Sequence, residues 1–417
     1  MNAPHDMLVA QEPIVFSLNG VDVSAAPGET IIQAADRLGV DIPRLCYKPG
    51  YRADGNCRAC MVEINGERVL APSCCRQPTP GMAVSSTSPR AIHSQKMIVE
   101  LLASDMPART YKTDSELDRW QRALGVGVPR FAPRAQPAAD VSHPAMSVNL
   151  DACIQCTRCV RACREEQVND VIGYAFRGSN SKIVFDLDDA MGESTCVACG
   201  ECVQACPTGA LAPANNAFTE PIDRKVASVC PYCGVGCQVT YHIHDDRIVH
   251  VEGRDGPANH ERLCVKGRFG FDYVSHPHRL TVPLVRRADV GKSADFTVDP
   301  ANPLAAFREA TWEEALALAG GTLKNIRDTR GPSALAGFGS AKGSNEEAYL
   351  FQKLVRTGFG TNNVDHCTRL CHASSVAALL EGIGSGAVSN PVMDVTQADV
   401  VLLIGANPVS NHPVAAT

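Results

Sequence analysis

The sequence predicts a multidomain chain, with α+β domains first and an α/β region from about Ala310 onward. Three observations support this fold class. Short strands joined by Asn-Gly pairs open the chain, and cysteines recur in tight clusters through its middle. Near the end, helical segments alternate with apolar segments that finish in glycine. A length of 417 residues is enough for about two to four domains.

The composition excludes several classes of function. The net charge of −6 and the pI near 6.1 argue against a nucleic acid partner. No run of about 20 apolar residues occurs, so no membrane-spanning helix is expected. The first residues, MNAPHDMLVAQEP, lack a basic region, an apolar core and a twin-Arg pair, so export is not expected. We therefore expect a cytoplasmic protein without a membrane partner.

The 19 cysteines are the dominant feature of the composition. Disulfides and metal ligation are the two alternatives for so many thiols. Spacing of the C-x-x-C-x-x-C kind, in a long chain without an export signal, favours metal ligation. Thiolates are soft ligands that select iron–sulfur clusters or zinc, so both kinds of metal site are considered below.

Residues 13–90 have the pattern of a small β-rich domain. The segment PIVFSLNGVDV predicts a hairpin with a two-residue Asn-Gly turn at 19–20. Thr30 is expected to cap a helix over 31–38, which ends near the following glycine. The segment MVEINGERVL predicts a second hairpin at 65–66.

Four cysteines of this domain follow the spacing C-x10-C-x2-C-x13-C: Cys46, Cys57, Cys60 and Cys74. A zinc ribbon is the alternative interpretation, but its paired cysteines are usually about two to four residues apart. The adjacent Cys75 is interpreted as a packed thiol rather than a ligand.

This spacing after a β-grasp pattern resembles the [2Fe–2S] domain of the large iron–sulfur subunit of NADH dehydrogenase. The same domain opens the catalytic subunits of NAD-dependent formate dehydrogenases and some iron hydrogenases. In that family a histidine and three cysteines hold a further [4Fe–4S] cluster. Residues 76–152 contain no cysteine, so we expect that cluster to be missing and His93 to be an ordinary helix residue.

Residues 91–106 predict an amphipathic helix, and the proline-rich residues 125–147 predict a linker. Two runs of C-x2-C-x2-C-x3-C follow, Cys153, Cys156, Cys159 and Cys163 and then Cys196, Cys199, Cys202 and Cys206. The runs resemble two-cluster bacterial ferredoxins, in which the fourth cysteine of each run binds the other cluster. The resemblance implies one [4Fe–4S] on Cys153, Cys156, Cys159 and Cys206, and a second on Cys163, Cys196, Cys199 and Cys202. Two zinc sites are the alternative.

A fourth group comprises Cys230, Cys233, Cys237 and Cys264, in CPYCGVGC and LCVKG. It resembles the N-terminal [4Fe–4S] domain of molybdopterin oxidoreductases that carry two pterin guanine dinucleotides. The resemblance places Lys266 between this cluster and one pterin, and a solvated surface lysine is the alternative. Three histidines nearby, His242, His244 and His250, invite a metal interpretation. We prefer plain alternation on two strands joined at 245–246.

The last region has an α/β pattern. Thr311 and Glu314 predict a capping box at the start of a helix. The segment SALAGFGS predicts a short strand and a glycine turn, and 345–356 a further helix. The apolar run 398–405 predicts a buried strand that ends in Gly405. Glycine turns after parallel strands favour a nucleotide-like ligand.

The segment GTNNVDHCTRLCHASSV closely resembles the formate dehydrogenase signature. The resemblance implies that Cys371 ligates molybdenum or tungsten and that His372 sits beside the substrate. A buried, unreactive Cys371 is the alternative, and Cys367 is expected to pack. The segment GANPVSNHP resembles a loop that contacts a guanine dinucleotide, through Gly405, Asn407 and His412.

Residues 13–417 thus resemble the N-terminal portion of the catalytic subunit of a cytoplasmic NAD-dependent formate dehydrogenase. The resemblance implies one [2Fe–2S], three [4Fe–4S] and a molybdenum or tungsten bis-(molybdopterin guanine dinucleotide) centre. It also implies oxidation of formate to CO2, or the reverse, with electrons passing to a flavin- and NAD-binding iron–sulfur partner subunit. The expected domains are 1–90 (β-grasp [2Fe–2S]), 91–148 (helix and linker), 149–218 (two-cluster ferredoxin), 225–285 ([4Fe–4S] domain) and 286–417 (first part of the bis-pterin α/β domain).

Two other functions remain as alternatives. The chain could be a non-catalytic electron-transfer subunit of an NADH dehydrogenase or hydrogenase-type complex, or a relative of periplasmic nitrate reductase. Family catalytic subunits are roughly twice this length, and the substrate-binding arginine of the family falls outside residues 1–417. We therefore expect these residues alone to fill their N-terminal clusters but to bind no stable bis-pterin cofactor and not to oxidise formate.

Overall fold

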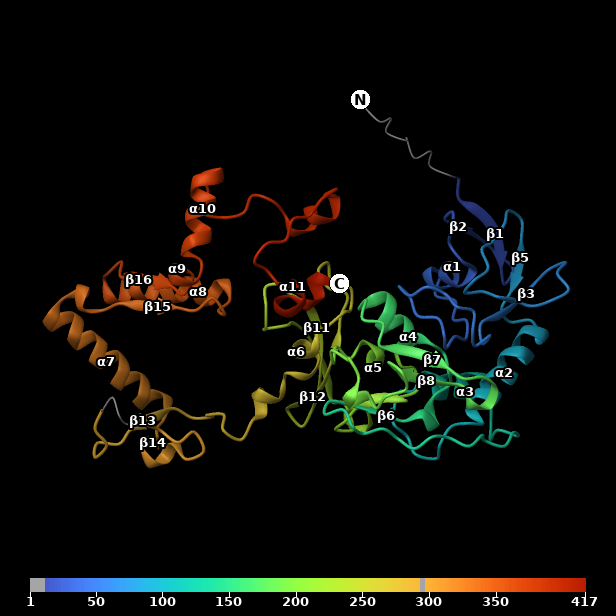
Figure 1. Cartoon of the computed structure of the whole chain (residues 1–417), viewed down its shortest axis with the longest axis horizontal. Helices are drawn as coiled ribbons and strands as arrows, with labels where there is room; N and C mark the ends of the chain where they lie inside the picture. The colour runs from blue at the N-terminus through green and yellow to red at the C-terminus, as the bar shows by residue number, and fades with distance from the viewer. Residues whose placement is uncertain (1–11, 293–296) are drawn as a thin grey trace, which may run out of the picture. The chain divides into compact units, whose positions relative to one another are not determined.

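The computed structural model describes residues 12–292 and 297–417 (Figure 1). The chain divides into two compact units, which are described separately. The first unit combines the described part of Met1–Phe271 with Asn407–Thr417, and the second is Asp272–Ala406. Among the described residues, no helix is both long and apolar enough to cross a membrane.

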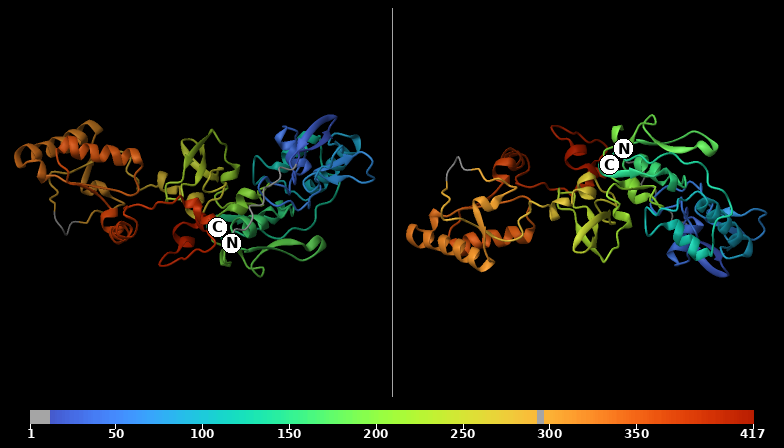
Figure 2. Two further views of the ribbon diagram at one scale, coloured as in Figure 1. Left: turned by 90° about the horizontal axis from the view of Figure 1, so that it is seen from above. Right: turned by 90° about the horizontal axis from the view of Figure 1, so that it is seen from below.

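The chain begins with a five-stranded sheet, drawn in blue in Figures 1 and 2. Its strands, in the order β2-β1-β5-β3-β4, are β1 (Ile14–Leu18), β2 (Val21–Ala25), β3 (Met61–Ile64), β4 (Ala71–Pro72) and β5 (Ala83–Ser85). Strands β1 and β5 run parallel, and the other pairs are antiparallel. The predicted first hairpin is confirmed, because Leu18 pairs with Val21 and both turn residues, Asn19 and Gly20, have positive φ.

Helix α1 (Ile31–Arg37) covers this sheet and is confirmed as predicted. The Thr30 N–H donates to the Gln33 side chain at 2.9 Å, which fixes the helix start. The second hairpin differs from its prediction. Strands β3 and β4 pair only from Val62 opposite Ala71, because Ile64 pairs instead with Val84 of β5. The connection is therefore longer than a two-residue turn.

Helices α2 (Pro89–Ala103) and α3 (Glu116–Leu124) pack on one another after the sheet. The sequence analysis predicted α2 but assigned no element to α3. Between α3 and Ala145 the chain has no helix or strand, yet it is held to its surroundings. Arg134 pairs with Asp105 at 3.1 Å, and Asp140 accepts a hydrogen bond from the Met191 N–H at 2.7 Å. The proline-rich segment thus has no regular secondary structure but is held in place by an ion pair and a hydrogen bond.

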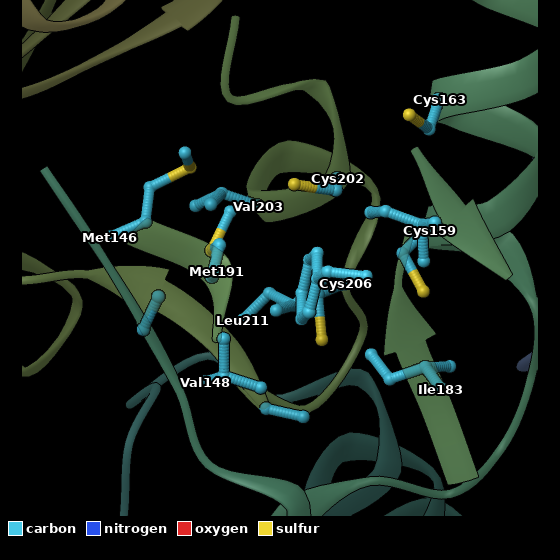
Figure 3. Packing of buried hydrophobic residues seen from close by; sticks show 14 of the residues in the cluster. Met146, Val148, Cys159, Cys163, Ile183, Met191, Cys202, Val203, Cys206 and Leu211 are labelled. Carbon is cyan, nitrogen blue, oxygen red and sulfur yellow. The ribbon is translucent and has the colours of Figure 1, made fainter. Parts of the chain in front are cut away.

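The next region is built from two short antiparallel pairs and two one-turn helices. The pairs are β6 (Met146–Val148) with β9 (Leu211–Pro213) and β7 (Ile172–Ala175) with β8 (Lys182–Phe185). The helices are α4 (Arg158–Arg161) and α5 (Glu201–Ala205). Figure 3 shows their shared core, in which cysteine sulfurs lie among aliphatic side chains such as Val148, Ile183 and Leu211.

The first unit ends in a three-stranded antiparallel sheet. Its strands are β10 (Arg224–Val229), β11 (Gln238–His244) and β12 (Arg247–Gly253), and α6 (Val265–Phe269) packs on β12. The predicted turn is confirmed, with positive φ at Asp245 and Asp246. Two short C-terminal helices, α11 (Pro408–Asn411) and α12 (Pro413–Ala416), also belong to this unit. Val414 of α12 is buried with Val239 and Val251.

The second unit has little buried core of its own. Its elements are β13 (Leu284–Arg286), β14 (Phe307–Glu309), α7 (Trp312–Arg330), β15 (Gly337–Gly339), α8 (Asn345–Lys353), β16 (Val364–His366), α9 (Thr368–Cys371) and α10 (Ala373–Ile383). Strands β15 and β16 are parallel, with α8 in the connection, which gives the β-α-β arrangement expected of an α/β region.

Two sequence predictions in the second unit are wrong. Residues 398–405 form no strand, and the side chains of Val400, Leu402 and Ile404 are exposed. A strand needs a neighbour for its backbone hydrogen bonds, and no strand of the described residues pairs with this segment. Thr311 accepts a hydrogen bond from the Glu314 N–H at 3.2 Å, but the Glu314 carboxylate binds Arg308 and so does not complete the capping box.

A buried ion pair joins two layers of the first unit. Arg268 on α6 pairs with Glu201 on α5 at 2.5 Å, and both side chains are almost fully buried. Arg268 also donates to the Cys199 carbonyl at 3.3 Å and to the Val251 carbonyl at 3.2 Å. The Glu201 carboxylate accepts a second hydrogen bond from the Leu263 N–H at 2.8 Å. Burial raises the pKa of Glu201, an effect that Arg268 opposes.

Arg268→Gln should lower the free energy of unfolding of the first unit by about 3–5 kcal/mol, because it leaves Glu201 buried without a counter-charge. Chemical denaturation of the anaerobic full-length chain measures this. The double variant Arg268→Gln/Glu201→Gln should recover part of the loss, since it removes the uncompensated charge. Arg224→Gln is the matched control, because it belongs to the same unit and its pair with Asp246 is solvent-exposed. An equal loss in that control would contradict the assignment.

Candidate metal centres

The first group of thiols lies beside the N-terminal sheet. Cys46, Cys60 and Cys74 are buried and Cys57 is half-buried. The Cys46 N–H donates to the Cys57 sulfur, and the Cys57 N–H donates to the Cys46 sulfur, both at 3.4 Å. Hydrogen bonds from the thiols of Cys57 and Cys74 lower the pKa of Cys46, and one from Cys74 lowers the pKa of Cys60 to about 7. The structure thus gathers all four predicted ligands of this group.

The two C-x2-C-x2-C-x3-C runs have the same local backbone. Gln155 and Ala198 occupy equivalent places, and both have positive φ. So do Thr157 and Gly200, two residues later, which precede α4 and α5. These turns aim backbone N–H groups at sulfur: the Ala198 N–H donates to Cys196 at 3.3 Å. An internal repeat in the sequence has therefore become a repeat of loop geometry.

The fourth cysteine of each run lies with the other run's first three. Burial raises the pKa of Cys153 to about 11 and of Cys156 to about 12, and repulsion from Cys206 adds to both shifts. Burial likewise raises the pKa of Cys196, with a further contribution from Cys163. The same holds for Cys159 and Cys202, whose pKa values burial and the neighbouring thiols raise well above the usual value.

The third region of the first unit gathers Cys230, Cys233, Cys237 and Cys264. Burial raises the pKa of Cys237 to about 12, and repulsion from Cys230, Cys233 and Cys264 adds to it. The Cys230 N–H donates to the Cys237 carbonyl at 2.8 Å, which closes the loop. A Cβ atom added at Gly267 would lie 3.4 Å from the Cys230 sulfur, so α6 packs directly against this thiol group.

The donor sets fit iron–sulfur clusters. Each group offers four sulfur atoms and no nitrogen or oxygen ligand, which is the donor set of [2Fe–2S] and [4Fe–4S] clusters. Thiols at this burial favour the protonated form, and a bound metal ion is what stabilises several adjacent thiolates. Tetrahedral zinc shares this preference for sulfur.

Buried arginines that the sequence analysis did not single out tie these groups together. Arg161 donates to the carbonyl of Cys46 at 2.6 Å and to that of Cys156 at 3.2 Å. Arg158 donates to the Tyr47 carbonyl at 2.6 Å and pairs with Glu116 at 2.7 Å. Both arginines lie inside a ligand run, between Cys156 and Cys163, and a buried cation there needs a structural partner. That position was the available signal.

The second unit holds the predicted catalytic pair. Cys371 is the last residue of α9, which begins two residues after β16, and His372 follows as the residue between α9 and α10. Both are exposed, so the interpretation of Cys371 as a buried, unreactive thiol is wrong. Cys367 is exposed as well, which corrects the prediction that it packs.

The remaining predicted residues are placed as follows. Lys266 is exposed on α6, two positions after Cys264. Gly405 belongs to the second unit and has positive φ, whereas Asn407 and His412 belong to the first. Asn407 caps α11, where its side chain accepts from the Ser410 N–H at 3.2 Å.

Two further predictions concern residues outside the ligand sets. Cys75 is exposed rather than packed, and its sulfur lies 3.6 Å from that of Cys74. A Cβ atom added at Gly55 would lie 2.9 Å from the Cys75 sulfur, so the glycine makes room for this side chain. His93 is exposed on α2, as predicted for an ordinary helix residue.

Comparison with protein families gives four matches along the chain. Residues 11–89 match the 2Fe-2S iron-sulfur cluster binding domain, and residues 146–210 match the 4Fe-4S dicluster domain. Residues 223–276 match the molybdopterin oxidoreductase Fe4S4 domain, and residues 279–417 match the molybdopterin oxidoreductase family. The matches follow the order in which the structure places the thiol groups and the Cys371 segment.

Individual relatives agree with these matches. A Bacillus subtilis protein named "Probable oxidoreductase YjgC" is 31% identical over 96% of this chain. A Staphylococcus haemolyticus protein named "Putative formate dehydrogenase" is 30% identical over 98% of it. The chain spans 44% of the length of each of these relatives. A crystal structure of NAD+-reducing [NiFe]-hydrogenase is 29% identical, with a TM-score of 0.47, over 51% of this chain and 92% of its own. This chain therefore carries a 2Fe–2S domain, a 4Fe–4S dicluster domain and a molybdopterin oxidoreductase Fe4S4 domain, followed by a segment of the molybdopterin oxidoreductase family.

Proposed function

We propose that this chain is the N-terminal part of a formate dehydrogenase catalytic subunit, which works in the cytoplasm and delivers electrons to a flavin- and NAD-binding partner subunit. The observation that carries the proposal is the exposed Cys371-His372 pair, directly after the parallel strand β16. Ligands of α/β sheets bind beyond the carboxyl ends of parallel strands. Relatives named as formate dehydrogenases support the choice of substrate.

The cofactors are assigned to residues as follows. The [2Fe–2S] cluster is held by Cys46, Cys57, Cys60 and Cys74, and the three [4Fe–4S] clusters by Cys153, Cys156, Cys159 and Cys206, by Cys163, Cys196, Cys199 and Cys202, and by Cys230, Cys233, Cys237 and Cys264. Cys371 ligates molybdenum or tungsten. Lys266, Gly405, Asn407 and His412 contact the two molybdopterin guanine dinucleotides.

The reaction converts HCOO⁻ to CO2, one proton and two electrons. When bound, the molybdenum or tungsten centre supplies the two-electron chemistry, and the clusters supply one-electron carriage. Cys371 would bind the metal as its thiolate, and its exposed position leaves the sulfur accessible to the metal. His372 precedes α10, and the positive end of that helix favours an anion such as formate. In this proposal, the imidazole of His372 orients the carboxylate and accepts the released proton.

The first unit holds the thiol groups in a rigid frame, across which electrons pass from one cluster to the next. Arg161 binds a carbonyl in the Cys46 group and another in the Cys156 group, so it fixes the spacing of these loops. Arg268 does the same between Cys199 and α6, the helix that begins after Cys264. Fixed spacing matters because electron transfer rates depend steeply on the separation of the carriers.

A non-catalytic electron-transfer subunit is the second candidate. One observation favours it: all four thiol groups lie in the first unit, so that unit can relay electrons without Cys371. The two functions differ in whether Cys371 binds a metal, so the Cys371→Ser variant distinguishes them.

The full-length chain, purified without oxygen, should contain about 14 iron atoms, which is the content of one [2Fe–2S] and three [4Fe–4S] clusters. Cys206→Ser should remove about four of these iron atoms, because Cys206 is the fourth ligand of the cluster that Cys153, Cys156 and Cys159 also bind. Cys75→Ser is the control and should leave the iron content unchanged. Elemental analysis with Mössbauer spectroscopy gives both values, and stoichiometric zinc in place of iron would overturn the cluster assignment.

Cys371→Ser in the intact enzyme complex should reduce formate-dependent dye reduction to background, because the metal loses its protein ligand. The iron content should not change, since the thiol groups of the first unit are untouched. Cys367→Ser is the matched control, an exposed cysteine four residues earlier that should keep its activity. Full activity of Cys371→Ser, or a complex in which molybdenum and tungsten are both absent, would favour the electron-transfer subunit instead.

A further inference from the structure

The β11–β12 hairpin carries a cluster of metal-ligand side chains that contains no cysteine. His242 on β11 and His250 on β12 are direct partners across the ladder, and Glu252 is two residues further along β12. Residues two apart on a strand point to the same face, so the three side chains share one side of the hairpin. Their ligand atoms all lie within 4.8 Å of one another.

The two histidines are buried, Glu252 is half-buried, and the three side chains are in contact. His242 is 3% exposed and His250 is 9% exposed. The His242 Nε2 atom lies 2.9 Å from a Glu252 carboxylate oxygen. The two imidazole rings stack with their centroids 3.9 Å apart, and Phe218 packs edge-on against His250 at 5.0 Å.

One nitrogen of this cluster lacks a partner. The Nδ1 atom of His250 is buried and has no hydrogen-bond partner among the described residues. A buried polar atom without a partner is costly, and most such atoms in native proteins are paired with protein, water or an ion. The stacked ring partner, His242, is already committed to Glu252.

A cavity of about 250 Å³ adjoins the cluster and is lined by all three residues. Its charged lining also includes two lysines, Lys112 and Lys225, and two further acids, Asp114 and Glu220. Three carboxylates against two ammonium groups leave one negative charge, which offsets the repulsion that the lysines exert on a cation. Lys112 is also turned toward the Cys206 carbonyl, at 3.5 Å, and the Phe218 ring.

We propose that His242, His250 and Glu252 form a site for a divalent transition metal of the zinc type, separate from the cysteine-ligated centres. Two imidazoles and one carboxylate form a common ligand set for such ions, and the remaining positions are open to water. The adjoining cavity gives the stacked His250 ring room to turn about its Cβ–Cγ bond. The His250 ring also packs edge-on against Phe218, which precedes the hairpin in the chain.

The neighbouring trio Asp223, His244 and Asp245 supplies the comparison. It also brings carboxylates and an imidazole within 4.8 Å, but Asp223 and Asp245 are exposed. His244 already contacts Asp223 through Nδ1 at 3.1 Å. Exposed acidic groups of this kind carry no site by themselves, so His244 serves as the matched control on the same hairpin.

The test uses the full-length chain, purified without oxygen with its iron in place, and Zn²⁺ as the probe. After titration and a wash with a weak chelator, elemental analysis gives the zinc content and zinc-edge X-ray absorption gives the ligands. We expect one zinc ion per chain with nitrogen and oxygen ligands at about 2.0–2.2 Å. His250→Gln and Glu252→Gln should each weaken zinc binding by at least about 10-fold, and His244→Gln should leave it unchanged.

Iron content and cluster absorption report whether each variant is folded. If His250→Gln loses iron, Glu252→Gln decides, because the amide keeps the size of the carboxylate and one acceptor oxygen for His242. Sulfur ligands at the zinc edge, no retained zinc in the unaltered chain, or equal zinc affinity in Glu252→Gln and His244→Gln would each overturn the proposal.

Discussion

The burial of closely spaced thiols is the constraint on which the first unit depends. A thiol in an apolar core favours the neutral form, and each neighbouring thiolate makes ionisation harder still. Cys159 and Cys202 sit at the centre of their groups and show this most strongly. A cation that satisfies four sulfurs at once removes this penalty, so cofactor binding and folding of the first unit are coupled.

The arginines solve a second problem that follows from the same constraint. Loops that wrap around a cluster turn their carbonyl groups outward, where some are buried without a strand or helix partner. Arg161, with five donors in a rigid fork, reaches the carbonyls of two such loops at once. Arg268 reaches one more, the Cys199 carbonyl, binds the Val251 carbonyl on β12, and also neutralises Glu201. Lysine could not replace either, because it lacks the planar fork.

The features that the sequence predicts correctly are those that depend on residues close together in the chain. The turn at Asn19-Gly20, the cap at Thr30 and the cysteine runs depend on residues a few positions apart, and the structure agrees with the first two. Long-range interactions were not predictable: Arg161 binds Cys46 across more than a hundred positions. The apolar run 398–405 was predicted as a strand from composition, yet strand formation depends on neighbours that the pattern does not specify. For the histidines of the β11–β12 hairpin, the sequence favours two alternating strands over a metal site. The ladder register, which the sequence does not give, is what brings His242 opposite His250.

The proposed exchange of the fourth cysteine between the two runs has a consequence for the order of events during synthesis. The set that begins with Cys153 lacks Cys206 until the ribosome has also made the whole second run, since Cys206 is that run's last cysteine. The second set, in contrast, uses Cys163, which has emerged long before. Neither run can therefore mature as a separate module, and a release of the nascent chain between them would leave the four thiols of the first run exposed to oxidation. The crossed arrangement makes the two centres a single assembly step, completed only when the chain has passed residue 206.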